Sequence, residues 1–291
     1  MARRLTIVGI GEALLVEHPD GRETAGLAAL VARHAVGLGH VGIAVSRVGQ
    51  DPQASELLDL LVARGVDTSH IQSDPDLPTG RVVVRAVGGT VARYVDARAA
   101  FDNLQSDFDL EDVAQQADAA VYGLLTRRAG QTRSEETRVL GACAGATKLF
   151  DMTNGAGVEP ERGHVLSGLE FADAAVVDRA VLDMLRPGSP DAPMREMVLD
   201  LMRDAGLAFV VSTQPEDRAD NGCVTLTLHT SETCCGAAIA AGFSPLVLAY
   251  VAILEHVLRG KPMRTALERA VRVVDHMIAH PNDLLPEDPS S

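Results

Sequence analysis

Apolar residues recur along this chain in two alternating patterns. Short runs rich in Val, Ile, Leu and Ala predict buried strands, and longer segments with apolar residues three or four positions apart predict amphipathic helices. The expected strands cover residues 5–10, 41–48, 119–124, 148–151, 174–177 and 208–212, and the expected helices cover residues 26–38, 53–64, 109–116, 131–144, 194–205, 236–258 and 263–280. Strands that alternate with helices in this way predict an α/β fold, a doubly wound and mostly parallel sheet flanked by helices.

Residues 79–95 break this alternation. Two stretches rich in β-branched residues lie on either side of Gly88-Gly89, and a Gly-Gly pair readily adopts the positive φ angles of a two-residue hairpin turn. We therefore expect an antiparallel hairpin within an otherwise parallel fold. Strand alternation places four valines on one face of this hairpin: Val82, Val84, Val91 and Val95. That face requires a partner, either the chain's own main domain or a second copy of the chain.

The composition favours a cytoplasmic protein with one large core. The chain has 291 residues, of which 46% are apolar, enough for a single α/β domain over residues 1–291 with a flexible tail at 281–291. No apolar run reaches the ~18–20 residues that cross a bilayer, and the N-terminus leads into a strand without the apolar region of a secretory signal. Four cysteines do not form a disulfide framework in a chain of this length.

The charge disfavours nucleic-acid binding. A formal net charge of −14 is spread along the chain, so DNA or RNA would be repelled over most of the surface. The basic stretches at Arg127-Arg128 and at residues 264–272 are short and fit the solvated faces of helices.

Four short motifs follow one another in a familiar order. They are Gly11-Glu12-Ala13-Leu14, Val48-Gly49-Gln50-Asp51, Pro78-Thr79-Gly80 and Phe150-Asp151. Together they resemble the G-E-x-L, V-G-x-D, P-T-G and F-D-x-N motifs of ribokinase or PfkB-type carbohydrate kinases. The resemblance implies a ribokinase-like fold in which two insertions, about residues 13–23 and 79–98, form a small β-sheet lid over the sugar and often a dimer contact.

Residues 231–243 resemble the D-T-x-G-A-G-D-x-F-x-A-G-F signature of this family without its chemistry. Gly236, Gly242 and Phe243 match the signature, but Ala237 stands at the position of the catalytic aspartate. In the family that aspartate takes the proton from the attacking sugar hydroxyl, which a methyl group cannot do. A positioned general base contributes ~10²–10⁴-fold in rate, so the resemblance implies slow phosphoryl transfer or none. We expect Ala237 in the first turn of a helix that opens at the carboxyl ends of the parallel strands.

The sugar site departs from the family in a similar way. The resemblance assigns Glu12, Val16, Gly26 and Leu30 to the substrate pocket, where Val16 and Leu30 replace hydrogen-bonding side chains. Unpaired polar groups in a closed pocket cost about 1–3 kcal/mol each. These two residues therefore favour a ligand less polar than a sugar.

The nucleotide site is also altered. In the family, backbone N–H groups at a helix start hold the γ-phosphate, and the resemblance assigns this role to Thr233, Cys234, Cys235 and Gly236. Backbone donors do not depend on the side chain, so an anion can still bind at such a helix start. The implied cofactors are ATP and Mg²⁺, with binding weakened or lost.

Three carboxylates near the signature are candidates for a relocated base. Glu232 is the nearest to Ala237 in sequence, and Asp217 and Asp220 lie in the preceding loop. The alternative interpretation is a solvated loop carboxylate, because a base must come within ~2.6–3.2 Å of the hydroxyl that it deprotonates.

Two other kinds of site have weaker support in the sequence. The Cys234-Cys235 pair would contain a reactive thiol at a helix N-terminus, with buried small residues as the alternative. Neither this pair nor His276 and His280, spaced i, i+4, comes with enough further ligands for a metal site. A dinucleotide site is disfavoured because Leu14 stands where the fingerprint beginning at Gly9-Ile10-Gly11 needs a third glycine.

Two functional hypotheses follow. The first is a PfkB-like protein with impaired or absent phosphotransferase activity that binds a small-molecule ligand in the old cleft. The second is an active ATP-dependent kinase that phosphorylates a hydroxyl of a sugar or another small molecule with a relocated base. Ala237 favours the first. The valine face of the hairpin predicts a homodimer through the lid, because an open apolar patch of that size is unusual on a soluble monomer.

Overall fold

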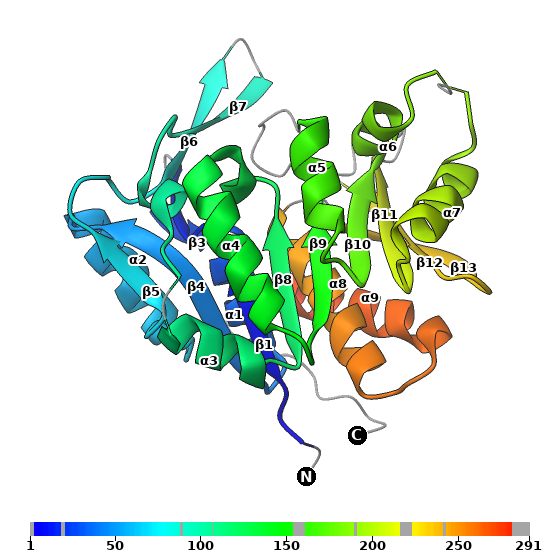
Figure 1. Cartoon of the computed structure of the whole chain (residues 1–291), viewed down its shortest axis with the longest axis horizontal. Coiled ribbons are helices and arrows are strands. Elements are labelled where there is room, and N and C mark those ends of the chain that lie inside the picture. The colour runs from blue at the N-terminus through cyan, green and yellow to red at the C-terminus, as the bar shows by residue number, and fades with distance from the viewer. Residues whose placement is uncertain are drawn as a thin grey trace.

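The computed structural model describes residues 3–18, 21–87, 90–106, 108–153, 161–188, 191–215, 223–240 and 243–280. These residues form two sheets flanked by helices (Figure 1). The strands of the large sheet are β1 (Thr6–Ile10), β4 (Val41–Gly49), β5 (Ile71–Asp74), β8 (Ala119–Gly123), β9 (Thr147–Asp151), β10 (Ala174–Asp178), β11 (Phe209–Pro215), β12 (Cys223–His229) and β13 (Cys234–Ala240). The strands of the small sheet are β2 (Leu14–His18), β3 (Gly21–Ala25), β6 (Arg81–Val87) and β7 (Thr90–Val95).

The helices connect and cover these strands. They are α1 (Leu27–Gly37), α2 (Pro52–Val62), α3 (Phe108–Gln116), α4 (Gly130–Ala142), α5 (Arg162–Leu169), α6 (Arg179–Leu185), α7 (Met194–Ala205), α8 (Phe243–Leu258) and α9 (Met263–Ala279), with 3-10 turns η1 (Ala100–Asn103) and η2 (Thr126–Arg128). The large sheet has the order β13-β12-β11-β10-β9-β8-β1-β4-β5, and the small sheet has the order β3-β2-β6-β7. From β5 to β11 the strands are parallel, and β12 and β13 extend the edge as an antiparallel hairpin. The doubly wound α/β prediction, with a separate small sheet, is confirmed.

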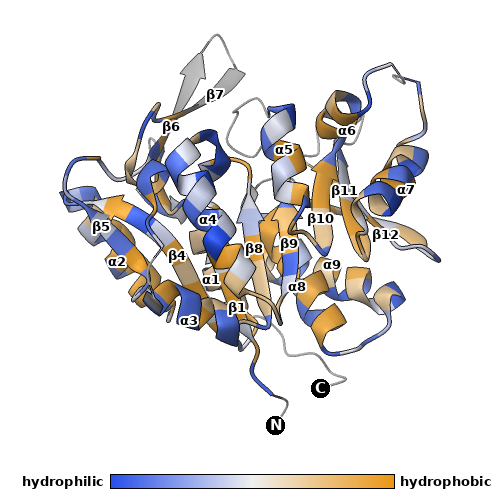
Figure 2. Cartoon of the chain, viewed as in Figure 1, coloured by the Kyte–Doolittle hydropathy of each residue, from blue (hydrophilic) through white to orange (hydrophobic). Residues whose placement is uncertain are grey.

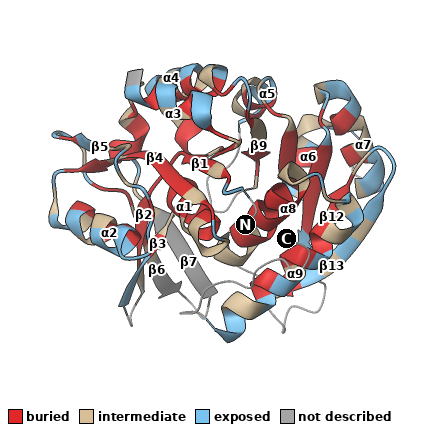
Figure 3. Ribbon diagram, turned by 90° about the horizontal axis from the view of Figure 1, so that it is seen from below, coloured by how far each residue is buried: buried red, intermediate tan, exposed pale blue. Residues whose placement is uncertain are grey.

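Successive residues of the central strands serve two different cores. Ile7 of β1 belongs to a cluster with α1, α8 and α9, whereas the next residue, Val8, belongs to a cluster with α3 to α7 on the opposite face. Figure 2 shows the central strands as largely hydrophobic, and Figure 3 shows the buried residues concentrated between the sheet and its helices. Burial of apolar surface on both faces is typical of a parallel sheet.

Helix α1 lies very close to the sheet. A Cβ atom at Gly42 of β4 would lie 2.0 Å from the carbonyl oxygen of Ala32, and one at Gly9 of β1 would lie 2.6 Å from that of Ala28. Only glycine permits this approach at either position. The close packing fixes the start of α1 beside the carboxyl end of β1, where Glu12 follows the strand.

The predicted helix over residues 236–258 is partly wrong. Residues 234–240 form β13, which pairs with β12, and the helix begins only at Phe243. Alanine-rich sequence favours helix locally, but β-propensity depends on the neighbouring strand. Strand β12, with its alternating Val, Thr and Leu residues, supplies that neighbour and was not among the predicted strands.

The direction of β13 decides which edge of the sheet its residues occupy. Cys234 pairs with His229, which pairs with Val210 near the start of β11, so β13 begins at the amino ends of the parallel strands. Ala240 pairs with Cys223, next to the residue paired with Pro215 at the end of β11. Helix α8 therefore follows a strand that ends at the carboxyl edge of the sheet.

The small sheet contains the predicted hairpin. Val87 pairs with Thr90, the residues on either side of Gly88-Gly89, and these two glycines lie outside the described residues. The register pairs Val82 with Val95 and Val84 with Arg93, as a two-residue turn requires. At the end near the main domain, Val82 and Val95 pack with Leu14, Val16 and Phe101 of the same chain. The chain itself therefore covers that part of the face.

Candidate functional site

Two buried carboxylic acids lie at the carboxyl ends of the parallel strands. Glu12 comes two residues after β1, and Asp151 is the last residue of β9, and the side chains are 4% and 2% exposed. In doubly wound folds, ligands bind at this edge of the sheet. We call Glu12 and Asp151 the acid pair.

Glu12 closes the start of helix α1. Its Oε1 atom accepts a hydrogen bond from the backbone N–H of Leu27 over 3.0 Å, and its carbonyl oxygen accepts one from Ala28 over 3.1 Å. Gly26, the N-cap residue, has a φ of 88° and offers no side-chain cap. A Cβ atom there would lie 2.4 Å from the Glu12 carbonyl oxygen, so this contact requires glycine. The Oε2 atom of Glu12 is buried and has no hydrogen-bond partner among the described residues.

Asp151 joins strand β9 to helix α8. One carboxylate oxygen, Oδ1, accepts hydrogen bonds from the backbone N–H and the hydroxyl of Thr153 over 2.8 and 2.6 Å. The other, Oδ2, accepts a hydrogen bond from the hydroxyl of Tyr250 over 2.9 Å. Asp151 was part of the F-D-x-N resemblance, but no signal in the sequence predicted its contact with a residue 99 positions away.

The environment of the acid pair disfavours the charged forms. Burial raises the pKa of Glu12 to about 7, and the charge of Asp151 acts in the same direction, against the hydrogen bond from Leu27 and the charge of Arg128. Burial likewise raises the pKa of Asp151 to about 6, although the hydrogen bonds from Thr153 and Tyr250 oppose the shift. A carboxyl group with a pKa near 7 can accept or donate a proton at neutral pH.

Arg128 connects this edge of the sheet to the small sheet. Its guanidinium group forms a bidentate ion pair with Asp102, at 2.8 and 2.7 Å, and lies 5.0 Å from the ring centre of Phe101. It also donates a hydrogen bond to the carbonyl oxygen of Asp96, whose carboxylate accepts one from the backbone of Arg81 at the start of β6. Arg128 and Asp96 thus connect the base of the β6–β7 hairpin to the region of the acid pair.

The V-G-x-D and P-T-G motifs meet in a structural network. Asp51 caps helix α2 by accepting a hydrogen bond from Ala54 over 2.8 Å, and it accepts two more from Thr79, through the backbone N–H at 2.8 Å and the hydroxyl at 2.7 Å. The Thr79 hydroxyl oxygen in turn accepts a hydrogen bond from Gly49 over 3.0 Å. These motif residues hold the strand ends in place, and their contacts leave them no evident chemical role.

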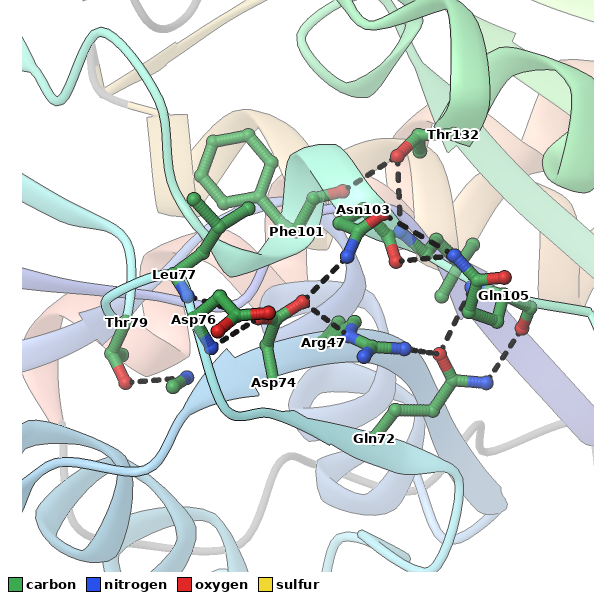
Figure 4. Close-up of polar contacts among 12 residues, drawn as sticks. Arg47, Gln72, Asp74, Asp76, Leu77, Thr79, Phe101, Asn103, Gln105 and Thr132 are labelled. Carbon is green, nitrogen blue, oxygen red and sulfur yellow. Dashed lines mark hydrogen bonds and ion pairs between the residues drawn. The ribbon is translucent and has the colours of Figure 1, made fainter.

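Asp74, at the end of β5, organises the neighbouring contacts. Figure 4 shows Arg47 and Asn103 directed at its carboxylate, at 2.8 and 2.7 Å, while its other oxygen accepts backbone hydrogen bonds from Asp76 and Leu77. Burial alone would raise the pKa of Asp74, but these hydrogen bonds and the Arg47 charge hold it below its usual value. The network is fully paired and gives no sign of a ligand.

The four residues assigned to a substrate pocket do not form one group. Glu12 and Gly26 are in contact at the start of α1. Leu30 is 1% exposed and belongs to the core cluster between α1, the large sheet and α8. Val16 belongs to β2 of the small sheet and packs in the cluster that contains Phe101. Their aliphatic character is thus explained by core packing, and it carries no information about the polarity of a ligand.

The residues assigned to anion binding and catalysis lie far from the acid pair. Thr233, Cys234, Cys235 and Gly236 occupy the turn and the first residues of β13 at the amino edge of the sheet, so the expected helix start is not there. Ala237 is in the middle of β13 and not in a helix.

Glu232 does not lie near the acid pair either. It is exposed in the turn before β13, and a seven-residue strand spans about 20 Å, so Glu232 lies roughly that far from the carboxyl edge. Asp217 and Asp220 lie outside the described residues.

A different helix, α8, starts at the carboxyl edge of the sheet. Ser244, in its first turn, accepts a hydrogen bond from Arg33 of α1 over 2.8 Å and lies 3.2 Å from Nε2 of His34. Burial, with the charge of Arg33, lowers the pKa of His34 well below its usual value, so this histidine is neutral at pH 7. Arg33 also donates a hydrogen bond to the hydroxyl of Thr24 over 3.3 Å. A backbone helix start with an adjacent guanidinium group suits a phosphate.

Two other expectations concern metals and membranes. Within the described ranges, no group of three or more His, Cys, Asp or Glu side chains is placed to hold a metal ion. None of the described helices has both the length and the hydrophobicity that spanning a membrane requires.

Solved structures share this fold, although neither a protein-family model nor a curated protein sequence matches the chain. They include a PfkB family carbohydrate kinase from Listeria grayi (TM-score 0.79, 16% identity, 97% of each chain covered). A 2-dehydro-3-deoxygluconokinase from Thermotoga maritima has a TM-score of 0.78 at 15% identity over 92% of each chain. An uncharacterized sugar kinase from Pyrococcus horikoshii, solved with ATP, has a TM-score of 0.68 at 19% identity over 92% of this chain and 90% of its own. The chain thus has the fold of PfkB-family sugar kinases, and these identities establish the fold alone.

Proposed function

We propose that this chain is a PfkB-like protein with impaired or absent phosphotransferase activity that binds a small-molecule ligand at the carboxyl ends of its parallel strands. The start of α8 carries this proposal. The resemblance assigns the catalytic base to Ala237, which has no carboxylate and lies in β13. Helix α8, which starts at this edge, has no carboxylate from Phe243 to Leu254. Loss of a general base raises the barrier by about 3–5 kcal/mol.

Ligand binding is supported by two features of the same edge. The buried Oε2 atom of Glu12 has no hydrogen-bond partner among the described residues, and an unmade hydrogen bond at a buried polar atom costs about 1–3 kcal/mol. A ligand hydroxyl or amine would supply that bond. The start of α8, with Arg33 beside Ser244, could hold the phosphate of a nucleotide, which in a kinase supplies the transferred group. The described residues offer no comparable set of ligands for Mg²⁺.

A thermal-shift screen tests binding and an ATP-turnover assay tests catalysis. A ligand at 100 times its Kd stabilises the folded state by about 2.7 kcal/mol, so ATP, ADP and a panel of sugars and sugar acids should reveal any that bind. With Mg·ATP and the same panel, we expect turnover at background. A kcat above roughly 1 s⁻¹, in the ordinary enzyme range, would contradict the proposal.

The acid pair favours a second candidate, an active kinase in which Glu12 is the relocated base. Its raised pKa, about 7, is close to the pH at which a general base works best. If any substrate in the panel is turned over, Glu12→Gln should reduce kcat by about 10²-fold or more, while Glu170→Gln, at an exposed position, should not. Turnover that survives in Glu12→Gln would exclude Glu12 as the base.

A further inference from the structure

A cysteine, a histidine and a serine from three neighbouring strands lie in a row on one face of the large sheet. Cys234 of β13 pairs with His229 of β12, and His229 pairs with Val210, two residues before Ser212 on β11. The Sγ atom of Cys234 lies 3.6 Å from Nδ1 of His229, and Nε2 of His229 lies 2.8 Å from Oγ of Ser212. We call these residues the Cys-His-Ser row.

The burial of the row is graded. Ser212 and His229 are 2% and 3% exposed, whereas Cys234 is exposed. The histidine is therefore fixed inside the sheet and the thiol faces solvent. A nucleophile within reach of a base that a third group orients is the arrangement that activates nucleophilic side chains. The row lies at the amino edge of the sheet, away from the acid pair, and so is independent of the function proposed above.

We propose that Cys234 is a reactive thiol that exchanges with small disulfides and thereby carries a mixed disulfide. In the step, the Cys234 sulfur attacks one sulfur of the disulfide, a new S–S bond forms and the old one breaks. The S–H proton passes to Nδ1 of His229 and then to the departing thiolate, which leaves as a free thiol. The cysteine is oxidised, the released thiol is reduced, and no other reactant is needed.

Ser212 and Arg195 set the state of the histidine for this step. Nδ1 can accept the proton only in the tautomer whose Nε2–H donates to Oγ of Ser212, so Ser212 is a positioning residue. Burial, followed by the charge of Arg195, lowers the pKa of His229 to about 4. The imidazole ring of His229 is thus neutral at pH 7, with the lone pair of Nδ1 free to accept the thiol proton. Because the imidazolium form is a strong acid, His229 then gives this proton up readily to the departing thiolate.

The neighbouring cysteine provides an internal comparison. Cys235 lies on the opposite face of β13, packed against the cluster that contains α8 and α9. Burial, with the charges of Cys234 and Glu268, raises its pKa. Cys143 is fully buried, and burial raises its pKa to about 11. Because the thiolate is the attacking form, both of these cysteines should react more slowly than Cys234.

Reaction of the folded full-length protein with 5,5′-dithiobis(2-nitrobenzoate) tests the proposal, since each exchange releases one coloured thiolate. We expect one fast thiol, which is lost in Cys234→Ser and kept in Cys235→Ser and Cys223→Ser. A positioned base contributes ~10²–10⁴-fold, and the low pKa of His229 places the expected loss in His229→Asn at the lower end, on the order of 10²-fold. Glutathione disulfide should add one glutathione at Cys234, seen by peptide mass spectrometry.

A second set of variants distinguishes activation of Cys234 by His229 and Ser212 from fast reaction due only to the exposure of Cys234. Ser212→Ala leaves the histidine in place and should still slow the fast thiol several-fold, and it serves as the test if His229→Asn does not fold. Thermal melts of each variant check that the sheet is intact. If Cys234 reacts no faster than the cysteines of the same chain unfolded in urea at the same pH, or if neither His229→Asn nor Ser212→Ala slows it, the proposal is wrong.

Discussion

The hydroxyl of Tyr250 donates a hydrogen bond to Oδ2 of Asp151 over 2.9 Å, and this contact joins helix α8 to the carboxyl end of strand β9. Both side chains are buried, at 0% and 2% exposure. The other oxygen of Asp151 is occupied by Thr153. Tyr250 thus stabilises the charged form of an acid that burial alone would keep protonated.

Tyr250→Phe should lower the free energy of unfolding by about 1–3 kcal/mol, because a buried carboxylate oxygen loses its donor. The loss should be larger at pH 8 than at pH 5, since hydrogen bonds to a charged group are the stronger ones and Asp151 titrates between these values. Urea unfolding at both pH values measures it. Tyr122→Phe is the matched control, because its hydroxyl donates over 2.8 Å to a neutral group, the carbonyl oxygen of Gly168. Equal losses at the two pH values for both variants would contradict the assignment.

Glu12→Gln should become more stable relative to the wild type as the pH rises from 5 to 8. In the folded protein the pKa of Glu12 is raised from 4.5 to about 7, so between these values the folded state binds more protons than the unfolded one. The wild type therefore loses stability as the pH rises through this window. Each pKa unit corresponds to about 1.36 kcal/mol, which puts the change at roughly 3 kcal/mol at most.

Urea unfolding of both proteins across this pH range measures the effect of Glu12. Glutamine cannot ionise, so the difference between the variant and the wild type isolates one group from the other acids. Glu170→Gln, at an exposed position, should differ from the wild type by a constant amount. A difference for Glu12→Gln that is flat, or that favours the wild type at high pH, would show that Glu12 is not buried in its neutral form.

Ala237→Asp should not create kinase activity and should destabilise the sheet. Ala237 pairs with Leu226 and packs against the core cluster under α8 and α9, so a carboxylate there costs about 1–3 kcal/mol. The next residue, Ala238, is exposed on the opposite face, and Ala238→Asp should change stability by less than about 0.5 kcal/mol. Denaturant unfolding compares the two. A gain of ATP turnover in Ala237→Asp would contradict its place in the strand.

The sequence predicts the fold well where local signals agree with the tertiary structure. The capping residue Asp51 precedes a proline at the start of α2, and the β-branched stretches around Gly88-Gly89 pair in the expected two-residue register. In each case the residues that fix the structure are close in the chain.

The predictions fail where contacts between residues far apart in the sequence determine the local structure. The stretch from Cys234 to Ala240 is alanine-rich and becomes a strand only because β12 lies beside it. The signature therefore predicts a helix start at residues 233–236, whereas the helix at the carboxyl edge starts at Phe243. Asp151 and Tyr250 are 99 residues apart and Glu12 and Asp151 are 139 apart, and no periodicity encodes such contacts. The row formed by Cys234, His229 and Ser212 depends in the same way on the register of three strands.

The small sheet supports a last proposal, that two copies of the chain dimerise through it. Strand alternation predicts Val84 and Val91 on the same face as Val82 and Val95, and the main domain covers Val82 and Val95. A hairpin is marginally stable alone, and an open apolar face is unusual on a soluble monomer. A two-fold axis would cover both copies of this face with one self-complementary contact.

Val84→Asp or Val91→Asp should therefore convert a dimer to a monomer, because each places a carboxylate in the buried face of the contact. Val83→Asp is the matched control: strand alternation predicts Val83 on the opposite face of the hairpin, so this variant should remain dimeric. Light scattering at tens of micromolar measures the mass, and thermal melting shows whether the main domain is still folded. If the wild type is already monomeric at that concentration, or if Val83→Asp dissociates the dimer as readily as Val84→Asp, the contact does not run through this face.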